Sequence, residues 1–265
     1  MSRTLHSKSK AKNKMQTGYT QAKIQTLDLE GVRTAYRRVG VSEGTPILFL
    51  NHLAANMDGA DPKIVDSLAA HFPVITFDYQ GIGRSGGEAP LTVEEMARDT
   101  IAFVRGLGYS RVHLLGLSLG GFVAQAMLTE APELIASVIL AGTGPAGDPG
   151  IARVPRITYY DTLRGVLRGR DPRYFLFFPV MKEARAKGEA FIARTSGYAD
   201  ADKPTTLKTL RRQLDAVVAW AKAATQDFSG ITQRVWVING DNDRMVPTSG
   251  SYDMAHRLPN ATLTI

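Results

Sequence analysis

The stretch Val112-His113-Leu114-Leu115-Gly116-Leu117-Ser118-Leu119-Gly120-Gly121 decides the fold of this 265-residue chain. An apolar run ends here in a serine between small residues, and apolar side chains then recur at helical spacing as far as Pro132. We therefore expect a strand, a sharp turn and a helix, with Ser118 exposed on the turn. Gly116 and Gly120 favour this interpretation, because residues without a Cβ let a strand and a helix approach closely.

A serine on such a turn can act as a nucleophile. The helix that follows has unpaired N–H groups at its N-terminus, and these stabilise a developing negative charge. The alternative is that Ser118 only caps the helix. The pattern Gly-x-Ser-x-Gly does not decide between the two, because a chain this rich in glycine matches it by chance in roughly one case in ten. The strand and helix on either side favour the nucleophile.

Composition indicates one large globular unit. Hydrophobic residues make up 44% of the chain and charged residues 22%, which are ordinary values. No apolar run approaches the ~18 residues that would cross a bilayer. The chain has no cysteine, which excludes disulfides, thiolate metal sites and a cysteine nucleophile. We expect a cytoplasmic protein without a membrane partner.

The net charge of +7 is distributed unevenly. Residues 1–18 hold five basic residues and no acidic one, and residues 151–225 hold 15 basic and 7 acidic residues. The remainder of the chain holds 12 basic and 18 acidic residues. The basic N-terminal segment lacks aromatic residues, so we expect a solvated, disordered arm. Nucleic-acid binding is the least favoured alternative, and we predict no nucleic-acid partner.

Short apolar runs alternate with helical patterns along most of the chain. Runs at 23–29 and 32–38 flank a turn and predict antiparallel edge strands. Runs at 46–51, 74–78, 137–140 and 235–239 are typical of buried parallel strands. Helices are expected at 61–71 and from Thr92, which begins a capping box with Glu95. The alternation predicts an α/β fold, a mostly parallel sheet with helices on both faces.

Nearly a hundred residues separate the strands predicted at 137–140 and 235–239, which is too many for one crossover. Leucines at helical spacing and a cluster of aromatic residues lie in this interval. We predict an inserted helical cap at 145–228, so that the chain divides into a basic tail (1–22), a first part of the core (23–144), the cap and a second, truncated part of the core (229–265). Helices that only pack on the core are the alternative.

The segment Gly81-Ile82-Gly83-Arg84-Ser85-Gly86 matches the dinucleotide-binding fingerprint after a strand. In that fingerprint the glycines open the helix directly, whereas here further residues precede the helix that begins near Thr92. We therefore predict no nucleotide. No other cofactor and no metal is expected, because the candidate groups are a hydroxyl, a carboxylate and backbone amides.

Three motifs together resemble the α/β-hydrolase superfamily, specifically its small bacterial esterase and cofactor-free haloperoxidase-like branch. The motifs are Gly116-Leu117-Ser118-Leu119-Gly120-Gly121, Asp78-Tyr79-Gln80-Gly81-Ile82-Gly83-Arg84-Ser85 and Gly240-Asp241-Asn242-Asp243-Arg244-Met245-Val246-Pro247. The resemblance extends from about residue 25 to the last residue and implies the α/β-hydrolase fold. It also implies Ser118 as the nucleophile and Asp243 as the acid, with Asp241 less favoured.

The resemblance implies two N–H donors for an oxyanion hole as well. One is the backbone of Leu119, directly after the nucleophile. The other belongs to the loop after Asn51, at Leu53, with Ala54 as the second choice. This loop departs from the family, because Asn51-His52 stands where His-Gly is usual.

The histidine of the family follows the final strand, and none of the five histidines of this chain fits that place. The segment 261–265 resembles the start of that strand. We therefore expect either a C-terminally truncated hydrolase or a relative that has lost turnover. His52 is the nearest substitute base. Restoring a segment that carries the histidine is expected to raise activity by several orders of magnitude.

The combined prediction is a serine hydrolase that acts on carboxylic esters or related acyl substrates. The cap is expected to form an apolar pocket for a small or medium acyl group, with Phe177 and Phe178 as substrate-binding residues. Two alternatives stay open. One is a catalytically impaired or non-catalytic protein on the same fold, and the other is a perhydrolase or C–C bond hydrolase.

Overall fold

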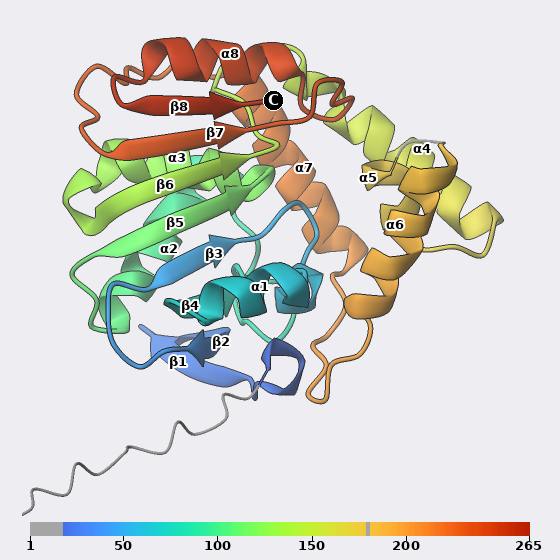
Figure 1. Ribbon diagram of the computed structural model, residues 1–265, viewed down its shortest axis with the longest axis horizontal. Helices are drawn as coiled ribbons and strands as arrows, with labels where there is room; N and C mark the ends of the chain where they lie inside the picture. The colour runs from blue at the N-terminus through green and yellow to red at the C-terminus, as the bar shows by residue number, and fades with distance from the viewer. Residues whose placement is uncertain (1–17, 179–180) are drawn as a thin grey trace, which may run out of the picture.

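The computed structural model describes residues 18–178 and 181–265, and an eight-stranded sheet lies at its centre (Figure 1). The strand order is β1-β2-β4-β3-β5-β6-β7-β8. β2 runs antiparallel to β1 and β4, and all other neighbours are parallel. The strands are β1 (Gln25–Leu29), β2 (Val32–Gly40), β3 (Ile47–Leu50), β4 (Pro73–Phe77), β5 (Val112–Leu117), β6 (Ile135–Ala141), β7 (Arg234–Ile238) and β8 (Ala261–Thr264).

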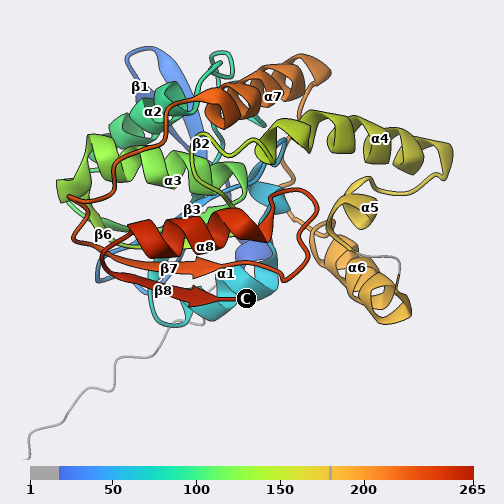
Figure 2. The same ribbon diagram turned by 90° about the horizontal axis from the view of Figure 1, so that it is seen from above.

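Helices cover both faces of this sheet, as the alternating pattern predicted (Figure 2). One face carries α2 (Val93–Gly106), α3 (Leu119–Glu130) and α8 (Thr248–Arg257), whereas α1 (Pro62–Ala69) packs on the other, against β2 and β4. Thr92 caps α2 as expected, since its Oγ1 accepts from the N–H of Glu95 at 3.2 Å, but the Glu95 carboxylate accepts from the N–H of Leu91 and not from that of Thr92. Trp236, on the α1 side of β7, stays 45% exposed.

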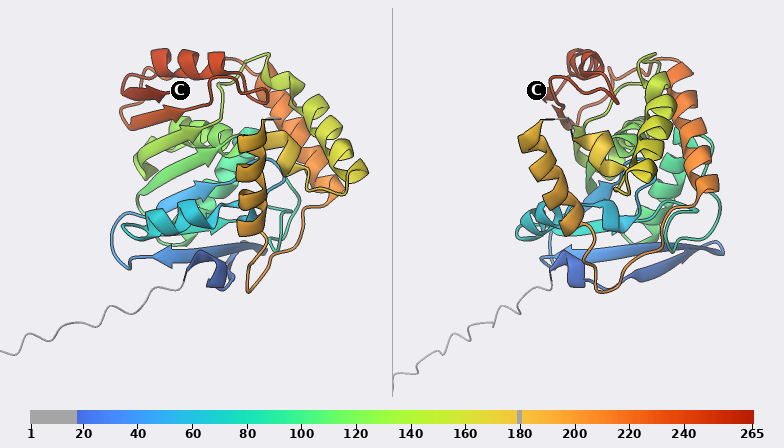
Figure 3. Two further views of the ribbon diagram at one scale, coloured as in Figure 1. Left: turned by 45° about the vertical axis from the view of Figure 1, so that its right-hand side comes forward. Right: turned by 90° about the vertical axis from the view of Figure 1, so that its right-hand side faces the viewer.

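Four helices occupy the interval between β6 and β7: α4 (Val154–Leu167), α5 (Arg173–Phe177), α6 (Lys182–Arg194) and α7 (Leu207–Lys222). They stand beyond the carboxyl ends of the parallel strands, and the right-hand view of Figure 3 looks onto them. In open α/β sheets this is the end at which ligands bind. The segment predicted as a cap therefore supplies helices at the edge where β5 delivers Ser118.

The first 17 residues of the predicted tail lie outside the described residues, but the rest of that segment packs on the core. Tyr19 is fully buried, and its hydroxyl donates to the carbonyl of Met57 at 2.7 Å. Its ring also packs edge-on against Tyr198, which lies between α6 and α7. The ordered unit therefore begins before residue 23, because a buried aromatic ring with a satisfied hydroxyl holds the segment in place.

A buried pair of carboxyl groups joins the segment between α6 and α7 to the core. Asp78 follows β4, and its Oδ1 accepts from the N–H of Met57 at 2.8 Å. Asp202 faces it beside Gly83, where a Cβ would overlap both carboxyl groups. Burial and the neighbouring Asp202 carboxyl raise the pKa of Asp78 well above its ordinary value. Asp78 therefore keeps its proton to a higher pH in the folded protein than an exposed carboxyl group does.

The raised pKa of Asp78 predicts how stability depends on pH. The unfolded chain releases the proton above about pH 4, whereas the folded chain keeps it to higher pH. The folded state then binds more protons, so the free energy of unfolding must fall as pH rises through the raised pKa of Asp78. In Asp202→Asn the amide donates to Asp78, and urea unfolding at a series of pH values should show a flatter profile and higher stability at pH 8.

The matched control is Asp215→Asn, which changes an exposed carboxylate on α7. It should leave the wild-type pH dependence unchanged. An Asp202→Asn protein that loses stability at pH 8 would show that the Asp202 carboxyl group does not raise the pKa of Asp78.

Candidate active site

The turn between β5 and α3 holds Ser118 in a strained backbone conformation. Its φ of 53° and ψ of −116° lie in a region that L-residues rarely adopt. Backbone bonds hold it there: its N–H donates to the carbonyl of Ala141 at 2.9 Å, and its carbonyl accepts from Thr143 Oγ1 at 2.9 Å. The Ser118 hydroxyl accepts no bond from the first turn of α3. Capping is therefore not the role of this side chain.

Glycines are needed where β5 and α3 meet. A Cβ on Gly116 would lie 2.6 Å from the carbonyl oxygen of Gly120 and 2.7 Å from the Cα of Gly121. Both neighbours are backbone atoms, which cannot move aside as a flexible side chain would. The close approach that the sequence predicted at this turn is thus present.

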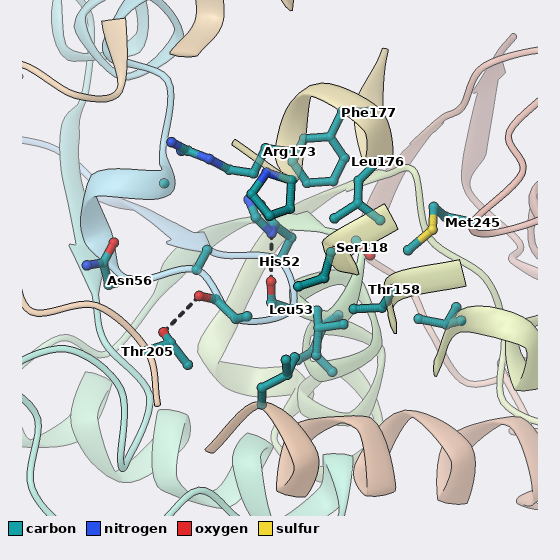
Figure 4. A pocket seen from close by; sticks show the side chains of 18 of the residues that line it. His52, Leu53, Asn56, Ser118, Thr158, Arg173, Leu176, Phe177, Thr205 and Met245 are labelled. Carbon is teal, nitrogen blue, oxygen red and sulfur yellow. Dashed lines mark hydrogen bonds between the residues drawn. The ribbon is translucent and has the colours of Figure 1, made fainter. Parts of the chain in front are cut away.

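Ser118 lines two adjoining cavities, of about 460 and 920 Å³. Figure 4 shows the smaller one. The smaller cavity lies among the loop after β3, the start of α3, and helices α4 and α7. The larger cavity lies between α5, α6 and the loop 240–245. The residues that line both cavities are His52, Gly59, Ser118, Leu176, Phe177 and Met245. A substrate bonded to Ser118 could therefore extend into either cavity.

Two backbone N–H groups near Ser118 have no acceptor among the described residues. They belong to Leu119, the first residue of α3, and to Leu53, which lines the smaller cavity. The N–H of Ala54 is occupied, because it donates to Gln213 Oε1 on α7 at 2.8 Å. Ala54 also has a positive φ of 60°. The arrangement favours Leu53 over Ala54 as the second donor to an oxyanion.

Asp243 lies on the loop after β7 and lines the larger cavity together with Ser118. Its Oδ1 accepts from the N–H groups of Met245 and Val246 at 2.8 and 3.0 Å. A Cβ on Gly142, directly after β6, would lie 3.8 Å from Oδ2. Asp241 lines the same cavity. The carboxylate of Asp243 is thus held by its own loop. Its second oxygen lies beside the end of β6, the strand whose last carbonyl accepts from the N–H of Ser118.

The residue after Asp243 ties this loop to the helices above it. Arg244 pairs with Asp161 of α4, a carboxylate with no exposed side-chain surface, and donates to the carbonyl of Phe175 at 3.0 Å. A buried carboxylate needs such a partner, because an unpaired buried charge is costly. The position of the Asp243 loop therefore depends on α4 and α5.

His52 is the one histidine in the described parts of the chain that lines either cavity. Its Nδ1 lies 2.9 Å from the carbonyl oxygen of Leu53, which can only accept, so Nδ1 carries the proton and Nε2 is the free acceptor. Nε2 is buried without a partner among the described residues. Burial lowers the pKa of His52 to about 4, so the ring is neutral at pH 7.

The two predicted substrate-binding rings occupy different places. Phe177 lines both cavities and packs edge-on against His52, with ring centres 4.9 Å apart. Phe178 lines only the larger cavity and packs on Phe191. Phe177 is thus the ring that lies nearer the border between the cavities, where Ser118 also stands.

Sequence reasoning missed Gln213, which is fully buried and holds the loop of the predicted oxyanion donor. A signal was present, since this amide lies among the leucines whose helical spacing marks the inner face of α7. Within residues 18–178 and 181–265, no group of three or more His, Cys, Asp or Glu side chains is placed to hold a metal ion.

The sheet order, the serine turn after β5 and the acidic loop after β7 define an α/β-fold hydrolase. The model of the family described as "alpha/beta hydrolase fold" matches residues 45–265. The chain therefore belongs to this family.

Similar proteins agree with this assignment. The poly(3-hydroxyalkanoate) depolymerase of Ectopseudomonas oleovorans is 29% identical over 256 residues, which cover 90% of this chain and 82% of the depolymerase. A Caulobacter vibrioides protein, RutD, whose name assigns it carbamate hydrolysis, is 27% identical over 205 residues. These residues cover 74% of this chain and 72% of RutD. The solved structure of an α/β-hydrolase fold protein from Chitinophaga pinensis is 29% identical in sequence, with a TM-score of 0.88. The match covers 94% of this chain and 90% of the other.

The close approach at the turn predicts a large effect of Gly116→Ala. The new Cβ would push β5 from α3, so the free energy of unfolding should fall by about 2 kcal/mol. The control is Gly230→Ala, because a Cβ at Gly230 meets no atom within 4 Å. Urea unfolding followed by circular dichroism measures both. Equal stability of the two variants would contradict the close packing described here.

Proposed function

We propose that this protein is a serine hydrolase that cleaves carboxylic esters or related acyl substrates, with Ser118 as the nucleophile. The observation that carries the proposal is the strained turn, which presents the Ser118 hydroxyl to two cavities. It does so near the N–H groups of Leu119 and Leu53, which have no acceptor in the described part of the chain. Donors fixed in advance around a developing oxyanion supply a large part of acyl-transfer catalysis. A cytoplasmic location is part of the proposal, since the chain has no cysteine.

The proposed reaction has two halves. Ser118 Oγ bonds to the acyl carbon, the carbonyl electron pair moves to oxygen, and the N–H groups of Leu119 and Leu53 donate to that oxyanion. Collapse of the intermediate expels the alcohol, which takes up the proton that the serine gave. Water then attacks the acyl-enzyme in the same way and releases the acid.

The proton of Ser118 needs an acceptor, and this limits the expected rate. His52 has a free Nε2, but a ring whose pKa is lowered to about 4 is a weak base. Asp243 orients no histidine of the described residues, although it shares the larger cavity with Ser118. We therefore expect slow turnover unless a stronger base enters that cavity.

Free imidazole supplies such a base and tests the roles of Ser118 and Asp243. A cavity of about 920 Å³ has room for it. Added imidazole should accelerate hydrolysis of p-nitrophenyl butyrate by roughly tenfold or more, because a positioned general base contributes at least that much. Ser118→Ala should abolish the acceleration, and its remaining rate measures the reaction of imidazole in solution.

Asp241→Asn is the matched control, since Asp241 lines the same cavity. Asp243→Asn should lose most of the imidazole-dependent rate, whereas Asp241→Asn should keep it. A fluorophosphonate probe should label the wild type and not Ser118→Ala. Labelling and turnover that survive in Ser118→Ala would rule out the proposed nucleophile.

An apolar acyl group is supported by the lining of the smaller cavity. Its walls include Leu53, Leu119, Phe122, Val154, Leu176, Leu207, Leu210 and Val217. The names of two relatives, a depolymerase of poly(3-hydroxyalkanoate) and a carbamate hydrolase, support attack at an acyl carbon. We assign the acyl group to this cavity, and Phe177 and Phe178 to substrate binding.

Removing a ring at the border of the cavities should change the preferred acyl length. In Phe177→Ala the ratio of kcat/KM for p-nitrophenyl octanoate over acetate should rise by roughly tenfold, because added space accepts further methylenes. Phe178→Ala should alter the ratio less, since Phe178 lines only the larger cavity. Phe72→Ala is the control, as Phe72 lines neither cavity. An unchanged ratio in Phe177→Ala would show that this ring only packs.

A further inference from the structure

Helix α4 presents two different faces. Its inner face carries Val154, Thr158 and Thr162, which line the smaller cavity, and the buried Asp161. Its outer face carries five large apolar side chains that are exposed. They are Tyr159 (48%), Tyr160 (64%), Leu163 (59%), Val166 (70%) and Leu167 (77%). These five residues are called the α4 stripe below.

The α4 stripe is continuous along one side of the helix. Counted from Tyr159, its members lie at i, i+1, i+4, i+7 and i+8, which places them on one side of the helix over about two turns. Figure 2 shows α4 at the rim of the molecule, with its C-terminal end projecting away from the sheet. Apolar residues scattered singly on a surface are ordinary, but a contiguous row of this kind marks an interaction surface.

Basic residues flank the α4 stripe in the sequence. Arg153 and Arg156 precede it, and Arg168 and Arg170 follow it. Arg170 pairs with Glu189, but the other three have no carboxylate within ion-pair distance in the part of the chain that the structure describes. The acid between residues 150 and 170 is Asp161, which is buried. The surface is therefore apolar at its centre and cationic at both ends.

The combination of an apolar centre and cationic ends decides between two binding partners for the α4 stripe. A second copy docked across a two-fold axis would bring arginines close to arginines, because the same patch faces itself in such a dimer. An anionic lipid surface instead takes up the apolar side chains among its acyl chains and pairs the arginines with its head groups. We propose that the outer face of α4 binds this protein to an anionic lipid surface.

The proposal differs from the expectation of no membrane partner, which rested on the lack of a membrane-spanning run. None of the described helices is long and apolar enough to cross a membrane. A helix that lies on the surface needs no such length, since only one face is immersed. Binding through α4 is independent of the chemistry at Ser118. It would place the lipid against the helix whose inner face lines the smaller cavity.

Co-sedimentation of the full chain with vesicles tests the proposal. Binding to phosphatidylcholine vesicles that contain phosphatidylglycerol should be much stronger than binding to phosphatidylcholine alone, and added salt should weaken it. The double variant Leu163→Glu/Leu167→Glu should bind the anionic vesicles at least about tenfold more weakly. The double variant Arg156→Gln/Arg168→Gln should lose the preference for anionic vesicles while keeping weak binding to both kinds.

The matched control is Leu91→Glu/Tyr252→Glu, which adds the same charge at exposed apolar positions outside α4. It should bind as the wild type does. All variants keep the basic N-terminal segment, so anionic binding that survives in Leu163→Glu/Leu167→Glu would assign it to that segment or to net charge and overturn the proposal. Circular dichroism spectra and melting temperatures equal to those of the wild type confirm that the variants fold.

Light scattering after gel filtration completes the test. The proposal expects a monomer whose mass does not change in Leu163→Glu/Leu167→Glu. A wild-type dimer that this double variant converts to a monomer, together with no vesicle binding, would show that the stripe joins two copies and would overturn the proposal. Hydrolysis by Ser118 enters none of these measurements, so their outcome is separate from that of the proposed function.

Discussion

The packing of β5 against α3 is the constraint on which the rest of the site depends. Their contact is backbone on backbone at Gly116, which forces the intervening residue into a conformation with positive φ. Strain of this kind persists only where the surroundings hold it, and here Ala141 and Thr143 supply those bonds from β6 and the loop after it. The position of the Ser118 hydroxyl at both cavities is thus a consequence of how closely one strand and one helix approach.

Polar contacts between residues far apart in the sequence attach the segment between α6 and α7 to the central sheet. Arg37 of β2 is fully buried, pairs with Asp58 at 2.7 Å, and donates to the carbonyl of Asp200 at 2.6 Å. Its guanidinium also lies over the ring of Tyr198, 4.8 Å from the ring centre. Such a network has directional bonds, so it sets one orientation of the segment 198–202, whereas apolar packing alone would accept several.

The fold and the position of Ser118 could be predicted from the sequence because both leave local signals. Alternating short apolar runs marked the strands, and Thr92 marked the start of α2. Two contacts could not be predicted from the sequence, because each joins residues far apart in the chain. They are the hydrogen bond between Gln213 and Ala54 and the ion pair of Asp161 with Arg244. Helical spacing likewise predicts that α4 has two different faces, but it does not predict which of them the other elements of the fold cover. Burial of Tyr19 was missed because the basic run before it indicated a solvated arm.

Gln213 has a consequence for how this protein can diverge. It stands on α7, whose side chains also set the width of the smaller cavity, and its amide holds the loop that carries Leu53. Under the proposed function, a substitution that reshapes α7 for a different acyl group therefore also turns the Leu53 amide that donates to the reacting carbonyl. The proposed function therefore couples selectivity and rate through one helix, and it implies that a lineage that changes its substrate through α7 must compensate in the loop after β3.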